Sequence, residues 1–108
     1  QNKEKIVSTY AKLVAEDNAR FVFASWTGPW VATSTAEEFP RHLPSIAERN
    51  NFYYADLVPV SRASEAVAGK EGKFQCDYHW NEDGNRYAAD ALYRYLTAHP
   101  MLLSRRPL

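Results

Sequence analysis

The stretch RFVFAS at residues 20–25 decides the fold class, because it has the length and the apolar character of one buried β-strand. Its apolar residues follow one another without alternating polar ones, which is typical of a strand that is covered on both faces. A second run, FYYADL at residues 52–57, is also largely apolar and carries Asp56 near its carboxyl end. The two runs predict two strands with other elements packed against both of their faces.

Helical patterns surround these strands. Asn2 is a candidate N-cap, and apolar residues then recur at helical spacing on one face. These residues are Ile6, Val7, Tyr10, Leu13 and Val14. Between the strands, residues 35–38 have the spacing of a capping box. Pro40 and Pro44 remove backbone donors, so we expect the helix that follows to be broken.

After the second strand, residues 59–73 are expected to form a long loop with one helical turn near residues 63–68. Asn81 then caps a last helix. Its apolar face consists of Ala88, Ala91, Leu92, Tyr95 and Leu96. Strands that alternate with helices predict an α/β fold with parallel pairing and helices on both sheet faces. Two parallel strands are too few for such a sheet, so either a partner segment completes it or residues 1–108 are the C-terminal part of a larger domain. We favour the second interpretation.

Composition excludes several partners. Lys and Arg together number 13, as do Asp and Glu, so the formal net charge is zero. Nucleic-acid and membrane-surface binding both need a basic excess on one face, and we therefore expect neither. No apolar run approaches the roughly 20 residues of a membrane-spanning helix. A single cysteine, Cys76, permits no disulfide within the chain.

The segment FQCDYHWN at residues 74–81 carries the chemistry. Asp77 and His79 are two residues apart, and in an extended segment such residues point to the same side. An ionised Asp beside a His fixes the imidazole tautomer and stabilises the imidazolium that forms when the His accepts a proton. Loops of this kind at the carboxyl edge of a parallel sheet are where active sites commonly lie. The spacing therefore lets Asp77 and His79 face one site as an acid–base pair, whereas such a pair, taken alone, is more often two solvated loop residues.

The segment DYHWNEDGN at residues 77–85, which runs into AADAL at residues 88–92, resembles the last conserved block of the SGNH (GDSL-type) hydrolase superfamily. The sequence Asp-x-His-Trp is similar to the branch that contains polysaccharide O-acetyltransferases and acetylesterases. The resemblance implies a three-layer αβα flavodoxin-like fold with parallel strands, of which this chain is the C-terminal portion. It also implies that His79 is the general base and Asp77 its orienting acid in a Ser-His-Asp triad.

The resemblance further implies a serine esterase or O-acyltransferase that acts on O-acyl esters, above all O-acetyl esters, with carbohydrates among the candidate substrates. In the family, the blocks with the nucleophilic Ser and the oxyanion-hole residues precede this region, and neither Gly-Asp-Ser nor Gly-x-Asn-Asp occurs here. The N-terminal half of the fold, from the same or another chain, would then supply them. Ser25 and Ser34 do not lie in a nucleophile elbow, so we expect neither to be the nucleophile.

Three tryptophans provide an alternative of another class, a non-catalytic carbohydrate-binding or interaction module. Trp26 and Trp30 follow the first strand, and Trp80 follows His79. Exposed aromatic rings at such an edge can stack on a sugar or line an acyl pocket, whereas rings packed under their own loop would only stabilise it. We predict no cofactor, and no metal either, because the acidic residues after His79 are better explained by the dipole of the last helix.

Overall fold

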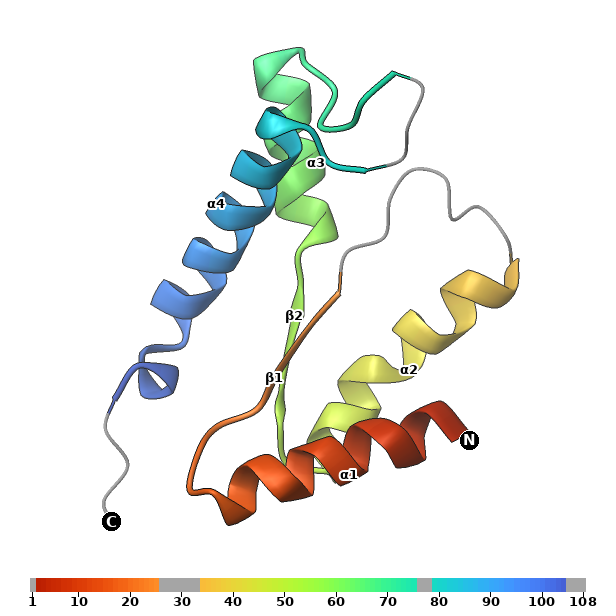
Figure 1. Ribbon diagram of the computed structural model, residues 1–108, viewed down its shortest axis with the longest axis vertical. Coiled ribbons are helices and arrows are strands. Elements are labelled where there is room, and N and C mark those ends of the chain that lie inside the picture. Colours follow the sequence, from red (N-terminus) through yellow and green to blue (C-terminus); the bar gives the residue numbers. More distant parts are fainter. Residues whose placement is uncertain (1, 26–33, 76–78, 105–108) are drawn as a thin grey trace.

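Two short strands and four α-helices make up the regular structure that the computed structural model describes, which covers residues 2–25, 34–75 and 79–104 (Figure 1). The elements in chain order are α1 (Asn2–Glu16), β1 (Val22–Ser25), α2 (Ser34–Arg49), β2 (Tyr53–Asp56), α3 (Val58–Ala68), α4 (Glu82–Ala98) and the short 3-10 helix η1 (Pro100–Leu102).

The two strands form a parallel pair, as the sequence predicts. Val22 lies opposite Tyr53 and Ser25 opposite Asp56. The backbone N–H of Tyr53 donates to the carbonyl oxygen of Phe21 at 3.0 Å, and the N–H of Leu57 donates to that of Ser25 at 3.1 Å. Both carboxyl ends therefore lie at the same edge of the sheet.

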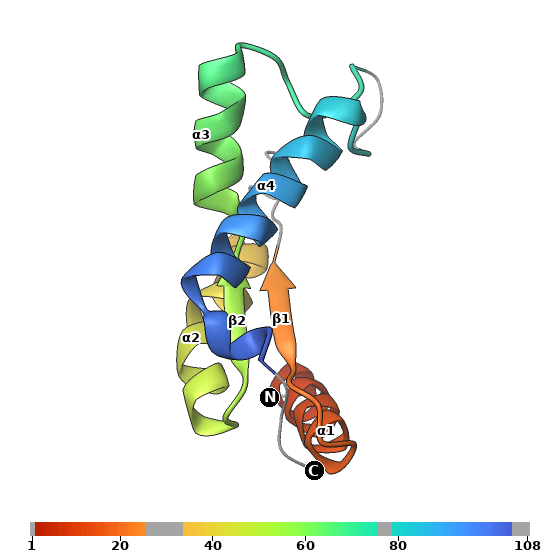
Figure 2. The same ribbon diagram turned by 90° about the vertical axis from the view of Figure 1, so that its left-hand side faces the viewer.

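Helices cover both faces of this pair, which confirms the mixed α/β class. On one face, α1 and α2 bury Val7, Ala11, Ile46 and Ala47 together with Phe52, against the partly buried rings of Phe21, Phe23 and Tyr54. On the other face, the cluster of Ala55, Leu57 and Ala91 joins β2 to α4. Figure 2 shows α4 in front of the strands and α2 behind them.

The prediction of a broken helix after residues 35–38 was wrong, because α2 continues from Ser34 to Arg49 through Pro40 and Pro44. A proline inside a helix removes one backbone hydrogen bond and costs roughly 3 kcal/mol. The second half of α2 offsets this cost by burying Leu43, Ile46 and Ala47. Packing against the sheet therefore outweighs the local preference.

The prediction of a long loop after β2 was also wrong, because eleven residues form α3. Pro59 lies in the first turn of α3, where its missing N–H has no intrahelical partner to lose. Gly69 ends the helix in the left-handed conformation with φ 66°, and its N–H donates to the carbonyl of Glu65. This pairing of an early proline with a late glycine is a helix signal that the sequence analysis missed.

Helix α1 has a wider apolar surface than the chain covers. Val7 and Ala11 are buried against α2. Three apolar residues on the neighbouring side of the helix are exposed. The exposed fractions of Ile6, Tyr10 and Leu13 are 57%, 60% and 53%. The helix itself is predicted correctly, but only one side of its apolar face belongs to a core.

The chain is also less compact than its mass requires. Its accessible surface is 8061 Å², against about 6,100 Å² for a folded monomer of 12.4 kDa, an excess of about 1,900 Å². Its radius of gyration is 15.5 Å, whereas compact domains of this length have about 13 Å. Within residues 2–25, 34–75 and 79–104, no helix is both long and apolar enough to cross a membrane.

Replacing Leu43 by Ala tests whether the apolar face of α2 holds the fold. Leu43 is 1% exposed, and truncation of such a side chain leaves a cavity that costs about 2–5 kcal/mol. We expect urea unfolding to show a loss of this size in Leu43→Ala. The matched control is Leu103→Ala, at a residue that is 68% exposed, where the change should stay within about 0.5 kcal/mol. Equal losses in both variants would contradict this description of α2.

Candidate functional site

A hairpin-like segment before α4 presents His79. Lys73 and Trp80 form an isolated antiparallel bridge, and the N–H of Phe74 donates to the carbonyl oxygen of His79 at 3.3 Å. The two arms of the segment therefore run side by side, with His79 on the second arm.

Asn81 holds this hairpin to the first turn of α4. Its side-chain Oδ1 accepts from the N–H of Gly84 at 2.9 Å, which is the N-cap bond that the sequence predicts. Its Nδ2 donates to the carbonyl oxygens of Glu71 at 2.9 Å and Lys73 at 3.0 Å. One side chain thus caps the helix and fixes the first arm of the hairpin, so that His79, two residues earlier, is tied to a rigid element.

Two glycines allow the hairpin to approach α4 closely. A Cβ on Gly72 would lie 2.8 Å from the Cα of Gly84, and a Cβ on Gly84 would overlap the carbonyl oxygen of Gly72. The backbone of Gly84 therefore lies directly against that of Gly72. Only glycine at both positions leaves room for this contact.

Bonds from α3 and α4 complete the attachment. The N–H of Gly72 donates to the Glu65 carboxylate at 2.8 Å, and the hydroxyl of Tyr87 donates to the carbonyl of Lys70 at 2.9 Å. Glu65 belongs to α3 and Tyr87 to α4, so both helices hold the base of the hairpin. The hairpin is therefore positioned by α3 together with α4, the helix that packs on one face of the sheet.

The hairpin lies beyond the carboxyl ends of the two strands. In Figures 1 and 2, both strands point toward the end of the molecule where α3, the hairpin and the start of α4 are found. Ligand sites of open parallel sheets lie outside this edge. His79 is exposed there, and an accessible imidazole can exchange a proton with a bound substrate.

The other predicted site residues are distributed unevenly. Asp77 lies outside the described residues, and so do Trp26 and Trp30. Trp80 is half-buried, and its Cβ would be 3.1 Å from a Cβ on Gly84, so its side chain begins beside the glycine contact and is not fully exposed. Of the five predicted site residues, only His79 and Trp80 belong to the described part of the chain, and they are consecutive in the sequence.

Ser25 has a hydroxyl partner that the sequence analysis did not anticipate. Its Oγ lies 2.7 Å from the phenolic oxygen of Tyr54. Burial raises the pKa of Tyr54 above its ordinary value of 10.0, and the hydrogen bond with Ser25 opposes that shift. A phenol that stays protonated at neutral pH is a poor base, so this pair does not activate Ser25 as a nucleophile. Asp56, opposite Ser25, accepts a hydrogen bond from the N–H of Val58 at 3.1 Å and so stabilises the start of α3.

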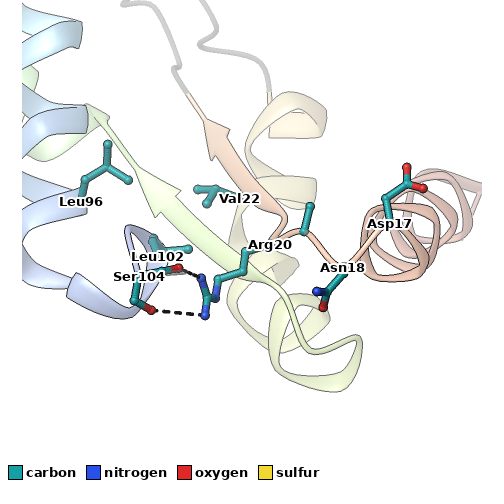
Figure 3. A pocket seen from close by; sticks show the side chains of 8 residues that line it. Asp17, Asn18, Arg20, Val22, Leu96, Leu102 and Ser104 are labelled. Carbon is teal, nitrogen blue, oxygen red and sulfur yellow. Dashed lines mark hydrogen bonds between the residues drawn. The ribbon is translucent and has the colours of Figure 1, made fainter. Parts of the chain in front are cut away.

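A cavity of about 370 Å³ lies at the opposite, amino end of β1. Figure 3 shows Arg20 reaching from the start of β1 to Ser104, where its Nη1 donates to the carbonyl oxygen at 2.6 Å. The cavity therefore lies between the chain entering β1 and the segment after α4. It is remote from His79 and belongs to the packing of the C-terminal segment.

No group of three or more His, Cys, Asp or Glu side chains is placed to hold a metal ion in the described part of the chain. Glu82 and Asp83 instead lie in the first turn of α4, where Arg86 pairs with both at 3.7 Å and 3.2 Å. Their position is that of acidic residues that complement a helix dipole.

Comparison of the chain with protein-family models, curated proteins and solved structures found no match.

Asn81→Ala should loosen the hairpin and destabilise the start of α4. Loss of an N-cap side chain costs about 0.5–2 kcal/mol, and here the donors to Glu71 and Lys73 are lost as well. Asn81→Asp is the matched control, since it keeps the acceptor for Gly84 but removes both donors. Hydrogen exchange should then accelerate at residues 71–75 in both variants, but at residues 82–85 chiefly in Asn81→Ala. Unchanged exchange at residues 71–75 in both would show that Asn81 does not hold the hairpin.

Alkaline pH should destabilise the fold through three buried or half-buried tyrosines. Burial raises the pKa of Tyr54, Tyr87 and Tyr95 in the folded chain. The unfolded chain then loses these protons first, so the stabilisation is complete below about pH 10 and is lost as pH rises through the folded pKa values. Urea unfolding at pH 9, 10 and 11 should show this decline, and Tyr54→Phe should make it shallower by a fraction of the about 1.4 kcal/mol per pH unit that one proton represents. A decline that begins well below pH 10 would point to other groups.

Proposed function

We propose that this chain carries the His-Asp part of a serine esterase or O-acyltransferase site. Its substrates would be O-acyl esters, above all O-acetyl esters, with carbohydrate esters as one class. The observation that carries the proposal is the placement of His79 on a hairpin that is clamped to α4 beyond the carboxyl ends of parallel strands. The resemblance of residues 77–92 to the last block of SGNH hydrolases points to the same chemistry.

In the proposed site, His79 acts as a general base. It accepts the proton of a serine hydroxyl while the serine oxygen attacks the ester carbonyl, and it later returns that proton to the leaving alcohol. Asp77 orients the imidazole and stabilises its protonated form. An acyl-enzyme then passes its acyl group to water or to a second hydroxyl, which separates an esterase from a transferase. The hydrogen bonds of Asn81 support this role, because they fix the segment that carries His79. A general base acts only within hydrogen-bond reach of its proton donor.

The serine and the oxyanion donors would come from a segment other than residues 1–108. The Ser25 hydroxyl lies 2.7 Å from the phenol oxygen of Tyr54. Among the described residues, no His is hydrogen-bonded to Ser25 as a base. A flavodoxin-like sheet of more strands would place such a segment on the same edge as the hairpin, because all carboxyl ends of a parallel sheet share one edge. We therefore propose a flavodoxin-like domain of which this chain is the C-terminal portion.

The alternative function is a non-catalytic carbohydrate-binding or interaction module that uses Trp26, Trp30 and Trp80. Such a module does not need His79, whereas the esterase does. Binding of a sugar to such a module would fail in Trp26→Ala or Trp30→Ala and survive in His79→Ala.

A fluorophosphonate probe and p-nitrophenyl acetate test the catalytic proposal on the native protein. We expect one fluorophosphonate adduct per site and a loss of esterase rate of at least about a thousandfold in His79→Ala. His42→Ala is the matched control, at an exposed histidine on α2, and it should keep full activity. Both variants should keep the wild-type circular dichroism spectrum.

Two results would contradict the proposal. Absence of any adduct would show that no activated serine exists. Equal esterase rates in wild type, His79→Ala and His42→Ala would show that the activity does not depend on His79.

A further inference from the structure

The hydroxyls of Ser25 and Tyr54 form a pair with one hydrogen to spare. Their oxygens lie 2.7 Å apart, so one hydroxyl donates to the other. Each hydroxyl carries one hydrogen, and the bond between them uses only one of the two. Among residues 2–25, 34–75 and 79–104, no acceptor is hydrogen-bonded to the second hydrogen. Because burial raises the pKa of Tyr54, the phenol stays protonated at neutral pH. The pair therefore has one O–H left to donate.

Asp56 places a carboxylate on the same face of the sheet. Phe23 and Tyr54 both pack toward the core that α1 and α2 supply. Alternate residues of a strand point to the same side, so Ser25 shares this face with Phe23, and Asp56 shares it with Tyr54. Ser25 and Asp56 also lie opposite each other in the parallel register. Burial is the main cause of the raised pKa of Tyr54, and the negative charge of Asp56 adds to it. The carboxylate is therefore within electrostatic reach of the phenol.

Asp56 also has one carboxylate oxygen to spare. Its Oδ1 accepts from the N–H of Val58 at 3.1 Å. In the part of the chain that the structure describes, no N–H or O–H donates to its Oδ2. Asp56 is exposed, and Ser25 and Tyr54 are half-buried. A spare donor and a spare acceptor thus lie together on one face of the sheet, within reach of solvent.

These groups lie at the end of the sheet where ligands bind. Ser25 is the last residue of β1 and Asp56 the last residue of β2, and ligands of open parallel sheets bind outside the carboxyl ends of the strands. The core residues that α2 supplies, Ile46 and Ala47, belong to its second half. Figure 1 shows that the first half of α2 diverges from the carboxyl ends of the strands. The spare groups therefore stand beyond the packed core.

Their chemistry selects a ligand that both accepts and donates hydrogen bonds. The O–H of the Ser25–Tyr54 pair requires an acceptor, and Oδ2 of Asp56 requires a donor. A hydroxyl group is both, and two neighbouring hydroxyls of a sugar can meet the pair and the carboxylate together. An aliphatic or aromatic alcohol without further hydroxyls would leave both groups unpaired, which lowers affinity. An anion would be repelled by Asp56.

We propose that Ser25, Tyr54 and Asp56 form a subsite for neighbouring hydroxyls of a polyol such as a sugar. The subsite holds the alcohol portion of the ester, and this assignment rests on the proposed function, in which His79 acts at the same edge of the sheet. Esters of carbohydrates are then the preferred substrates. Simple alkyl and aryl esters react without using the subsite.

Titration of the native protein with methyl glycosides, followed by NMR, tests the subsite without catalysis. The probes are the methyl glycosides of glucose, galactose and mannose. Their per-O-methylated forms are the control ligands, because they keep oxygen acceptors but have no hydroxyl donors. We expect at least one glycoside to shift the amide signals of residues 54–58, and the per-O-methylated forms to shift none of them.

Variants of the subsite should weaken this binding. Tyr54→Phe removes the phenolic O–H but keeps the ring that packs on Phe23, and it should lower glycoside affinity roughly three- to tenfold. Asp56→Asn keeps an acceptor for the N–H of Val58, and it should lower affinity at least about tenfold, since hydrogen bonds to a charged group are stronger. Asp56→Asn also serves if Tyr54→Phe does not fold. Tyr93→Phe is the matched control, at a tyrosine that is 67% exposed on α4, and should bind as the wild type does.

Kinetics separate the subsite from the catalytic group. With an acetylated form of the glycoside that binds, Tyr54→Phe should raise KM at least about threefold and leave kcat unchanged. With p-nitrophenyl acetate, the same variant should match the wild type. His79→Ala should lose both activities and keep glycoside binding.

Two sets of results would overturn the proposal in different ways. Glycoside affinity that is unchanged in Tyr54→Phe and Asp56→Asn, or equal binding of the per-O-methylated forms, would show that no such subsite exists, even where esterase activity depends on His79. Glycoside binding at residues 54–58 without any esterase activity would overturn the assignment to an ester substrate, and the proposed function with it.

Discussion

The parallel pairing of β1 with β2 is the constraint on which the rest of the structure depends. Four residue pairs fix it, from Val22 opposite Tyr53 to Ser25 opposite Asp56. Because the strands are parallel, the chain must cross over between them, and α2 is that crossover. The same direction places both carboxyl ends at one edge, toward which α3, the hairpin and the start of α4 are gathered. Reversing either strand would remove that edge and the placement of His79 with it.

The sequence predicts those features that local patterns determine. Unbroken apolar runs predict both strands, and the cap at Asn81 follows from residue chemistry alone. Prediction from the sequence fails where contacts between distant residues determine the local structure. Pro40 and Pro44 argue for a broken helix, but burial of the second half of α2 against the sheet keeps it continuous. No local pattern reveals that Gly72, twelve residues earlier in the chain, is the partner of Gly84.

The candidate site shows the same division. Residue types and spacing single out Asp77 and His79, but they do not show how His79 is held. The clamp requires the Asn81 amide to reach the carbonyls of Glu71 and Lys73, and the Glu65 carboxylate to reach Gly72. These bonds join segments that only the packing of α3 on α4 brings together. A periodicity analysis of α1 likewise finds one broad apolar face, whereas the fold covers only the side that carries Val7 and Ala11.

The open edge of β1 and the hairpin of His79 are connected by strand direction. A strand that joined β1 in parallel would end at the same edge as β1 and β2, and the loop after it would emerge on the side of the sheet where His79 lies. An antiparallel strand would direct that end toward the cavity beside Arg20 and away from the hairpin.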